Sequence, residues 1–380
     1  MADVVIIQEH LPHYRVAFFE GLRASLLDRG LSLALVYGRK SDSRMITTPL
    51  PWATGVDIRR FGPFAWHALA GACAGSRLII VPQEIKYLRC HLLWLTSRFA
   101  RRPVFAYWGH GRNFQAENPN SVSERIKALL SRRVDWWFAY NDLSAEVVGA
   151  LGFDPGRITV VGNTVDTATI KSVRAEVSEA DLVTARAKLG IGDGPVALYA
   201  GALYDRKRIP FLLAAAKQIK EAIPDFHLLV MGDGPQADMI KQASVSHPWI
   251  HHLGPLRDRE KAVYWELSEL LLMPGLVGLV VVDTFLFGVP MVTTDYPNHS
   301  PEIDYLKSGV NGLKVDCGED SGTYARAVID LLSRPEKVEK LSAAALESAE
   351  QHHLSGMIRR FADGIMEALE VSGIKEAGHA

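Results

Sequence analysis

The sequence predicts an α/β protein with two parallel-sheet domains. At 380 residues the chain is longer than one hydrophobic core normally spans, which indicates two domains. Short apolar runs alternate with helical patterns, and this alternation is typical of βαβ units whose parallel sheet is covered on both faces. The pattern occurs twice, on either side of the charged segment 171–194.

Each expected strand is a short, mostly apolar run, and helical stretches such as residues 15–30 separate the strands. In the first half we expect strands at 4–8, 31–38, 77–83, 103–109, 135–141 and 158–163. In the second half we expect strands at 195–203, 226–232, 250–254, 269–275, 290–295 and 312–316. No short repeat or low-complexity tract interrupts either series.

The domain boundaries follow from these two series of strands. Residues 1–170 are expected to form a first Rossmann-like domain, and residues 195–354 a second one. Residues 171–194 are interpreted as a linker that contains a helix. A C-terminal helix at about 355–372 is expected to pack back on the first domain.

The composition is that of a globular protein, with 48% hydrophobic and 22% charged residues. The N-terminal residues lack a basic stretch followed by an apolar one, and no window approaches 18 apolar residues, so neither a secretion signal nor a membrane span is expected. Cys73, Cys90 and Cys317 lie far apart, which fits neither a disulfide framework nor a zinc site. We therefore expect a cytoplasmic protein.

Charge is distributed unevenly along the chain. Residues 1–170 carry 20 Lys and Arg against 14 Asp and Glu, whereas the remainder carries 22 against 29. The basic excess lies in 86–102 and 125–133, where it is mixed with Leu, Trp or Phe at helical spacing. Such segments suit an anionic membrane surface, as in a peripheral protein on the inner face of the cell membrane. The alternative is ordinary helices with one core face and one solvated face, and the near-neutral pI argues against nucleic acid.

Glycines follow several expected strands of the second domain, and they indicate a phosphate site. The glycine-containing loops are at 199–208, 231–235, 253–256 and 274–279. Parallel sheets bind ligands beyond the carboxyl ends of their strands, where glycine allows close approach and helix N-termini offer N–H groups to an anion. Gly201 and Gly232 are therefore candidate ligand contacts, although each glycine alone is also a common turn residue.

Other ligand chemistries find no support in the sequence. The stretch "GDGP" lacks the third glycine of a dinucleotide fingerprint, and there is no P-loop GxxxxGK[ST]. There is also no DxD, no HExxH and no paired His/Cys spacing, so neither a metal nor a cofactor is expected.

In the second half, the motifs "GALYDRKR", "LLVMGDGP", "HHLGPL", "LLLMPGLVGLVVVDTFLFGVPMVTTD" and "SPEIDYLKSGVNGLKV" follow one another in this order. This order resembles the nucleotide-sugar domain of retaining GT-B glycosyltransferases of family 4, the glycosyl transferases group 1. In the first half, "LPHYRVAFFEGL", "YWGHGRN" and "VVGNTVDT" resemble the acceptor domain of that family. The resemblance implies a GT-B fold, two Rossmann-like parallel-sheet domains facing across a cleft.

The resemblance implies roles for the basic residues after the first strand of the second domain. Lys207 matches the family lysine that binds the donor diphosphate and serves catalysis, whereas Ala202 replaces the family arginine. Arg206 or Arg208 is expected to supply the second positive charge.

The resemblance also covers the apolar run 274–290. Asp283 matches the family glutamate that holds the donor ribose, and Gly275 stands where another family glutamate touches the donor sugar. The chain thus has PGxVGLxxxDxF in place of the usual ExxxxxxxE motif. Gly278 and Leu279 would present backbone amides to the diphosphate. In the alternative interpretation Asp283 only caps a helix that begins near Leu279.

Four further residues are candidates for contact with the donor. His110 in "YWGHGRN" matches a family histidine near the donor sugar and is a catalytic candidate, although loop histidines are often purely structural. Glu302 matches a family glutamate near the cleft. His299 and Ser300 are adjacent candidates for polar donor contacts.

On the acceptor side, "EHLPHYR" replaces the glycine-rich loop of many relatives, so His13, Tyr14 and Arg15 are candidate acceptor contacts. The expected reaction is transfer of a sugar, with retention, from a nucleotide diphosphate sugar to a glycan or lipid-linked acceptor, without a metal. Bacterial surface polysaccharide, lipopolysaccharide or glycoconjugate synthesis is the expected context. The departures at Ala202 and Gly275 motivate the alternative of a non-catalytic GT-B partner or regulatory protein. A nucleotide-sugar epimerase is not favoured, because this sequence lacks the paired carboxylates and histidine expected for proton transfer.

Overall fold

The protein divides into two compact units. The computed structural model describes residues 2–39, 50–62, 64–67, 69, 71–84, 86–97, 103–112 and 122–377. Unit 1 takes in the chain up to Asp166 together with the part from Leu354 onward, and unit 2 is the continuous stretch Thr167–His353. Each unit is built on one parallel sheet, which confirms the predicted fold class of two parallel-sheet domains.

The sheet of unit 1 has the strand order β3-β2-β1-β6-β7-β8-β9, and all neighbouring strands are parallel. Its strands are β1 (Val4–Gln8), β2 (Leu33–Gly38), β3 (Thr54–Val56), β6 (Leu78–Pro82), β7 (Val104–Gly109), β8 (Trp136–Ala139) and β9 (Ile158–Val160). The six strands expected in this half are confirmed, β1 with the expected bounds and the other five with shorter ones. The edge strand β3 and the hairpin of β4 (Ile58–Phe61) and β5 (Phe64–His67) were missed, because they lack the long apolar runs of buried strands.

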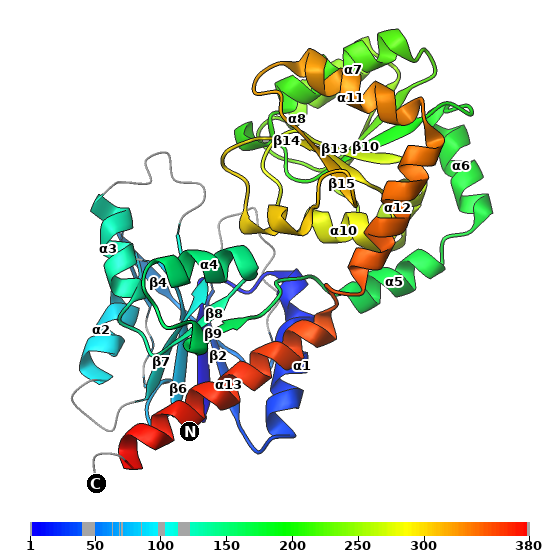
Figure 1. Ribbon diagram of the computed structural model, residues 1–380. Helices are drawn as coiled ribbons and strands as arrows, with labels where there is room; N and C mark the ends of the chain where they lie inside the picture. Colours follow the sequence, from blue (N-terminus) through cyan, green and yellow to red (C-terminus); the bar gives the residue numbers. More distant parts are fainter. Residues whose placement is uncertain are drawn as a thin grey trace. The chain divides into compact units, whose positions relative to one another are not determined.

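Helices cover both faces of this sheet. Those of unit 1 are α1 (Val16–Leu27), α2 (Leu88–Ser97), α3 (Val122–Ser131), α4 (Asp142–Ala150) and α13 (Leu354–Ala377). Helix α13 runs beside α1 in Figure 1, and Phe361 on α13 stacks on Phe138 of β8 with ring centroids 4.4 Å apart. The last helix of the chain therefore completes the core of the first unit.

The sheet of unit 2 has the strand order β12-β11-β10-β13-β14-β15, again with parallel neighbours. Its strands are β10 (Val196–Ala200), β11 (His227–Met231), β12 (Ile250–Gly254), β13 (Leu270–Met273), β14 (Met291–Thr294) and β15 (Gly312–Val315). All six strands were expected from the sequence. The central strands β10, β13 and β14 are completely buried, which explains their apolar sequences, whereas most of the edge strand β12 is half-buried.

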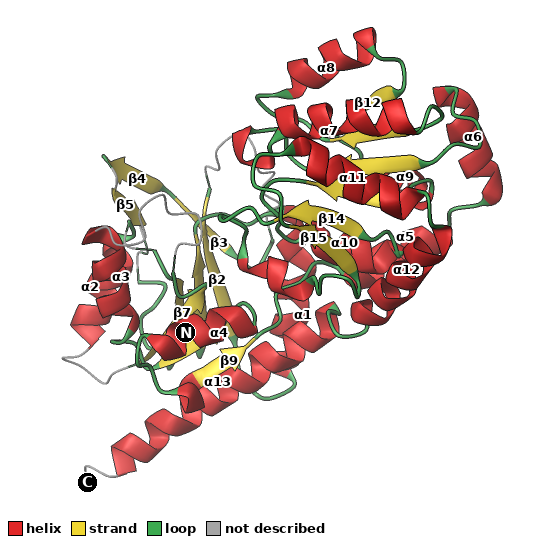
Figure 2. Ribbon diagram, turned by 45° about the horizontal axis from the view of Figure 1, so that its top comes forward, coloured by secondary structure: helices red, strands yellow, loops and turns green. Residues whose placement is uncertain are grey.

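The helices of unit 2 are α5 (Thr167–Ala175), α6 (Glu179–Leu189), α7 (Ile209–Ala222), α8 (Ala237–Ser246), α9 (Asp258–Glu266), α10 (Val280–Phe287), α11 (Ser321–Leu332) and α12 (Pro335–Ala349). Helices α7 and α11 lie side by side in Figure 2. The segment 171–194, interpreted as a linker with a helix, contains most of α5 and all of α6. Both helices pack on α9, so this segment is part of unit 2 in the structure.

The strand orders locate the ligand-binding edge of each sheet. The direction of winding reverses between β1 and β6 in unit 1, and between β10 and β13 in unit 2. Open α/β sheets bind ligands beyond the carboxyl ends of the strands at this reversal. In unit 2 these are the loops after Ala200 and Met273, which contain most of the candidate donor residues.

Candidate functional site

Lys207 lies in the loop between β10 and α7, and its side chain is buried. It is 7% exposed, and its ammonium group donates to the backbone oxygen of Leu276 in the loop after β13. No carboxylate pairs with it among the described residues. Burial lowers the pKa of Lys207 to about 8, because the charged form loses hydration. The site therefore holds a buried cation without a counter-ion between two strand-end loops, which is the electrostatic requirement for binding an anion.

Gly275 packs directly against the backbone that carries Lys207. A Cβ atom at this position would lie 2.3 Å from the oxygen of Arg206 and 2.5 Å from the carbonyl carbon of Lys207. Leu276 also donates its backbone N–H to Arg206 at 2.8 Å, which holds the two loops together. The absence of a carboxylate at Gly275 is therefore a packing requirement of this chain.

Gly278 and Leu279 precede the first turn of α10, as expected from the sequence. Leu279 is the N-cap residue, and no side chain caps the helix. Both residues are partly exposed, and within the described part of the chain their backbone N–H groups donate to no acceptor. The start of α10 thus presents two free amides next to the loop that binds the Lys207 ammonium group.

Asp283 lies one turn inside α10, and its carboxylate is paired with a lysine. Lys261 on α9 donates to Asp283 at 2.7 Å, and the two side chains are 26% and 14% exposed. The alternative that Asp283 caps the helix is wrong, because its partner is Lys261 and the cap position belongs to Leu279. Sequence reasoning missed Lys261, since its position 22 residues away gives no local signal.

The two arginines beside Lys207 differ in their surroundings. Arg208 is 9% exposed, donates to Thr294 at 3.1 Å and to Gly318 at 2.7 Å, and lies 4.1 Å from the ring centroid of Phe211. Arg208 therefore uses its hydrogen bonds to hold the strand ends of unit 2 together. Arg206 is half-buried, and of the two it is the better placed to meet a ligand.

Gly201 and Gly232 lie at adjacent strand ends, as predicted. A Cβ atom on Gly232 would lie 1.9 Å from the oxygen of Gly201, so only glycine fits at Gly232. Gly201 donates its backbone N–H to Met231 at 3.0 Å. The two glycines therefore allow the ends of β10 and β11 to pack closely beside the Lys207 loop.

His299 does not have the donor-facing role expected from the sequence. It is 7% exposed, its Nδ1 accepts from the backbone N–H of Val277 at 3.0 Å, and its Nε2 lies 3.0 Å from the oxygen of Thr294. Both ring nitrogens are thus used inside the protein. Ser300 is half-buried, and Glu302 is buried in the short helix Pro301–Tyr305.

In unit 1, Arg15 is buried among aromatic rings. It is 6% exposed, and its guanidinium carbon lies 5.3 Å from the Trp108 ring centroid and 5.9 Å from that of Tyr140. It donates to Asn163 at 2.5 Å, and no carboxylate pairs with it among the described residues. Cation–π contact stabilises this charge in place of an ion pair.

The other candidates in unit 1 lie at the same edge of its sheet. His110 follows β7, and its ring contacts Tyr140 with centroids 4.1 Å apart. His13 is exposed, and Tyr14 is half-buried with its ring centroid 6.0 Å from that of His13. Tyr140 therefore touches both His110 and Arg15, a connection that sequence reasoning did not find.

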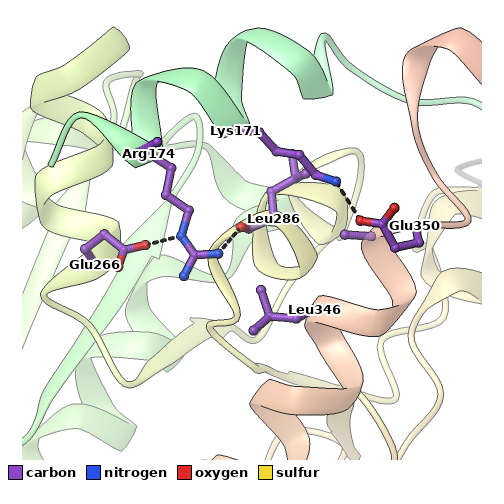
Figure 3. Close-up of a pocket in the computed structure, with 8 residues that line it drawn as sticks. Lys171, Arg174, Glu266, Leu286, Leu346 and Glu350 are labelled. Atoms are coloured by element: carbon purple, nitrogen blue, oxygen red, sulfur yellow. Dashed lines mark hydrogen bonds and ion pairs between the residues drawn. The ribbon is translucent and has the colours of Figure 1, made fainter.

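Unit 2 also contains a pocket at the other end of α10. Figure 3 shows this pocket, which has a volume of about 420 Å³. Lys171 pairs with Glu350 at 2.7 Å, and Arg174 pairs with Glu266 at 2.6 Å and donates to the oxygen of Leu286 at 2.7 Å. Because its charges neutralise one another, this pocket offers no unpaired charge to a ligand.

Two features bear on metals and membranes. Within the described ranges, no three His, Cys, Asp or Glu side chains are grouped so that they could hold a metal ion. None of the helices searched in that part of the chain is both long and apolar enough to cross a bilayer.

Comparison with known proteins relates this site to a family. Residues 194–334 match the family model described as "Glycosyl transferases group 1". The second unit is thus related to the group 1 glycosyltransferases. The match includes Lys207, the amides at Gly278 and Leu279, and Asp283.

Two curated relatives agree with this relation. A phosphatidyl-myo-inositol mannosyltransferase of Mycobacterium leprae is 28% identical over 48% of this chain and 49% of its own. D-inositol 3-phosphate glycosyltransferase 2 of Catenulispora acidiphila is 24% identical over 60% of this chain and 54% of its own. The chain therefore spans about half the length of the curated relatives it matches.

The fold extends the similarity to the whole chain. The structure of Alr3699/HepE of Anabaena in complex with UDP superposes with a TM-score of 0.69 at 16% identity, covering 96% of this chain and 100% of the other. The chain therefore has the GT-B fold, in which both units are Rossmann-like domains.

Proposed function

We propose that the protein is a glycosyltransferase that moves a sugar, with retention, from a nucleotide diphosphate sugar to a glycan or lipid-linked acceptor. The observation that carries this proposal is the group 1 match over residues 194–334, which coincides with the buried, unpaired cation of Lys207. Neither a metal nor a resident cofactor is part of the proposal.

We assign binding of the donor diphosphate to unit 2 because its positive groups can stabilise the negative charge of the leaving phosphate. Cleavage of the bond between sugar and diphosphate leaves negative charge on the departing phosphate, and fixed positive groups stabilise that charge in the transition state. Lys207 supplies a cation, and the amides of Gly278 and Leu279 supply oriented N–H donors. Arg206 is assigned to the same diphosphate, with Gly201 and Gly232 allowing the backbone to approach it.

Asp283 is assigned to the ribose of the donor. Its carboxylate is 14% exposed and retains acceptor capacity beyond its contact with Lys261, since an ionised carboxylate accepts several hydrogen bonds. Lys261 then holds the carboxylate in place for the ribose hydroxyl groups. Glu302 remains a proposed donor contact through the family resemblance alone.

Unit 1 is assigned to the acceptor. His13 and Tyr14 are the accessible candidates for binding it, and Arg15 supports this edge from inside its aromatic surroundings. His110 is proposed to orient the donor sugar or the leaving phosphate. Because a relative from Mycobacterium leprae is named for a phosphatidyl-myo-inositol substrate, a lipid-linked acceptor of bacterial envelope glycoconjugate or lipopolysaccharide synthesis is the proposed class.

Unit 1 has an exposed apolar surface beside its basic segments, and this surface suits such an acceptor. Leu92 and Leu95 of α2 and Leu129 of α3 are 36%, 49% and 54% exposed. The two basic segments lie together, since the indole N–H of Trp94 donates to the oxygen of Arg133 at 3.1 Å. Residues 98–102 of the first segment lie outside the described residues. We propose that this surface rests on anionic lipid at the inner face of the membrane.

A nucleotide-binding experiment tests the donor site. Ligands that bind only the folded state raise its melting temperature, so UDP, GDP, ADP and dTDP are compared, with UDP first because the HepE structure contains it. We expect one nucleotide to raise the melting temperature of the wild type and of Lys217→Met, an exposed lysine. Lys207→Met should abolish the shift without lowering the melting temperature of the ligand-free protein, because it removes a buried charge.

The non-catalytic alternative gives a different result. It predicts that no nucleotide shifts the melting temperature, or that one binds and no donor sugar is released. The comparisons give it no support, since the relatives described above carry the names of glycosyltransferases. Release of free sugar from the donor in the absence of acceptor, measured for wild type and Lys207→Met, separates a transferase from an inert binder.

The role of Asp283 is tested against that of its partner. If the carboxylate binds ribose, Asp283→Ala should weaken nucleotide binding more than Lys261→Met does. If Asp283 serves only its ion pair, both variants should lose similar stability, and neither should change nucleotide affinity.

A further inference from the structure

The segment that follows β13 is held by hydrogen bonds at successive backbone groups. The oxygen of Pro274 accepts from the Thr294 hydroxyl at 2.8 Å, and the N–H of Leu276 donates to the oxygen of Arg206 at 2.8 Å. The oxygen of Leu276 accepts from Lys207. Because these groups are buried and paired, the segment has little conformational freedom before it reaches α10.

His299 makes the last of these contacts. Its Nδ1 accepts from the N–H of Val277 at 3.0 Å, so the ring proton must lie on Nε2, from which it donates to the oxygen of Thr294 at 3.0 Å. The neighbouring Ser300 donates its backbone N–H to the oxygen of Val277 at 3.1 Å. Val277 is thus fixed on both its N–H and its oxygen by two consecutive residues.

The free amides begin directly after Val277. Gly278 and Leu279 are partly exposed. The N–H of Val281 makes the first hydrogen bond of this turn, to the oxygen of Gly278 at 3.2 Å. The direction in which the two free N–H groups point therefore depends on how Val277 is held.

We propose that His299 is a positioning residue that fixes Val277 and thereby aims the amides of Gly278 and Leu279 at the donor diphosphate. This inference rests on the proposed function, because it needs the diphosphate to bind at these amides. It assigns to His299 a role in preorganising the site rather than in touching the donor.

The surroundings of His299 support a permanently neutral ring. Burial lowers the pKa of His299 to about 4, so Nδ1 remains an acceptor throughout the neutral range. The charged groups that act on the ring are Lys207, Lys314 and Asp295, and the ring of Tyr296 lies 5.6 Å away. A neutral, fully bonded ring at 7% exposure has no polar atom left for a ligand.

Two matched variants separate positioning from general packing. His299→Asn places a side-chain oxygen near the position of Nδ1, so it can keep the bond from Val277 while losing the bond to Thr294. His299→Gln extends its amide to the position of Nε2, so it can keep the bond to Thr294 while losing the bond from Val277. A purely structural role predicts similar behaviour for both variants, since each loses one buried hydrogen bond.

The first measurement is amide hydrogen exchange of peptides spanning 274–287 in the ligand-free protein. We expect His299→Gln to exchange at least about tenfold faster than the wild type in this segment and His299→Asn to stay within about threefold. The second measurement is the affinity for the nucleoside diphosphate that stabilises the wild type. It should fall about tenfold in His299→Gln and about threefold or less in His299→Asn.

Each outcome decides the inference. Equal losses of affinity in the two variants, or wild-type exchange and affinity in His299→Gln, would overturn it. If the wild type binds none of UDP, GDP, ADP and dTDP, the proposed function is wrong and the role in aiming the amides is wrong with it. The exchange experiment then still shows whether His299 holds Val277.

Discussion

At the scale of single residues, Gly275 shows how a departure from a family pattern is explained by packing. The sequence shows only that a glutamate is missing there. In the structure the backbone of Arg206 and Lys207 occupies the space that any side chain would need. The glycine and the buried position of Lys207 are therefore two parts of one arrangement.

This arrangement predicts that a glutamate at position 275 is harmful. We expect Gly275→Glu and Gly275→Ala to lower the free energy of unfolding by at least about 2 kcal/mol, because the added Cβ forces backbone apart. Gly278→Ala is the control, since the nearest atom to a Cβ there is the Ser300 hydroxyl oxygen at 4.0 Å. Urea denaturation measures the difference, and wild-type stability of Gly275→Glu would refute the explanation.

Lys207 gives a prediction about pH. Its lowered pKa of about 8 means that the cation is lost as pH rises through that value. If a diphosphate binds to the ammonium form, the dissociation constant should rise about tenfold per pH unit above about 8.5. Calorimetric titration from pH 7 to about 10 should show this rise in the wild type and in Lys217→Met, whereas Lys207→Met should show no binding at any pH in this range. A flat wild-type profile contradicts the assignment of Lys207.

The same lowered pKa of Lys207 also predicts how the free energy of unfolding changes with pH. Between about pH 8 and 10.5, the unfolded chain retains the proton on Lys207 and the folded chain releases it, so stability rises with pH in this window. The slope should be smaller in Lys207→Met than in Lys217→Met, which removes an exposed lysine.

At the scale of elements, helix α2 combines a core face with an exposed apolar one. Cys90 is buried, whereas Leu92 and Leu95 are three residues apart and share the exposed side. The two interpretations of the basic segments are therefore compatible, because one helix packs on the core and also exposes leucines. Whether a membrane covers this side remains a prediction of the proposed function.

A vesicle experiment tests the exposed side of α2. We expect Leu92→Gln with Leu95→Gln to weaken sedimentation with phosphatidylglycerol vesicles about tenfold, since burying two leucines in the interface contributes to binding with the basic charges. Leu27→Gln is the control, because Leu27 is 70% exposed on α1 of the same unit. Equal binding of the double variant and the wild type would exclude this surface.

The elements also show what the sequence could and could not predict. All twelve expected strands exist, and the central ones were predicted because buried parallel strands are continuous apolar runs. The hairpin β4–β5 was missed since it is short and exposed, as Arg59 and Arg60 show. The pairing of Lys261 with Asp283 and the contact of His299 with Val277 each join positions 22 residues apart, which no local pattern records.

At the scale of the whole molecule, each unit has its own core, and the core of unit 1 includes the last helix. Phe361 on α13 and Phe226 in unit 2 are both 0% exposed. We expect Phe361→Ala and Phe226→Ala each to cost about 3–5 kcal/mol of stability, because each leaves a cavity. Hydrogen exchange should accelerate in the strands of unit 1 for the first variant and of unit 2 for the second. Acceleration in the opposite unit would contradict this division.

The position of α13 has a consequence for how the protein is made. Unit 2 is one uninterrupted stretch of chain, whereas unit 1 requires a helix that is synthesised after all of unit 2. As the nascent chain leaves the ribosome, the strands of unit 1 emerge first, with Phe138 still uncovered. Unit 1 therefore completes its folding last, and until then it presents an apolar surface that a chaperone can bind.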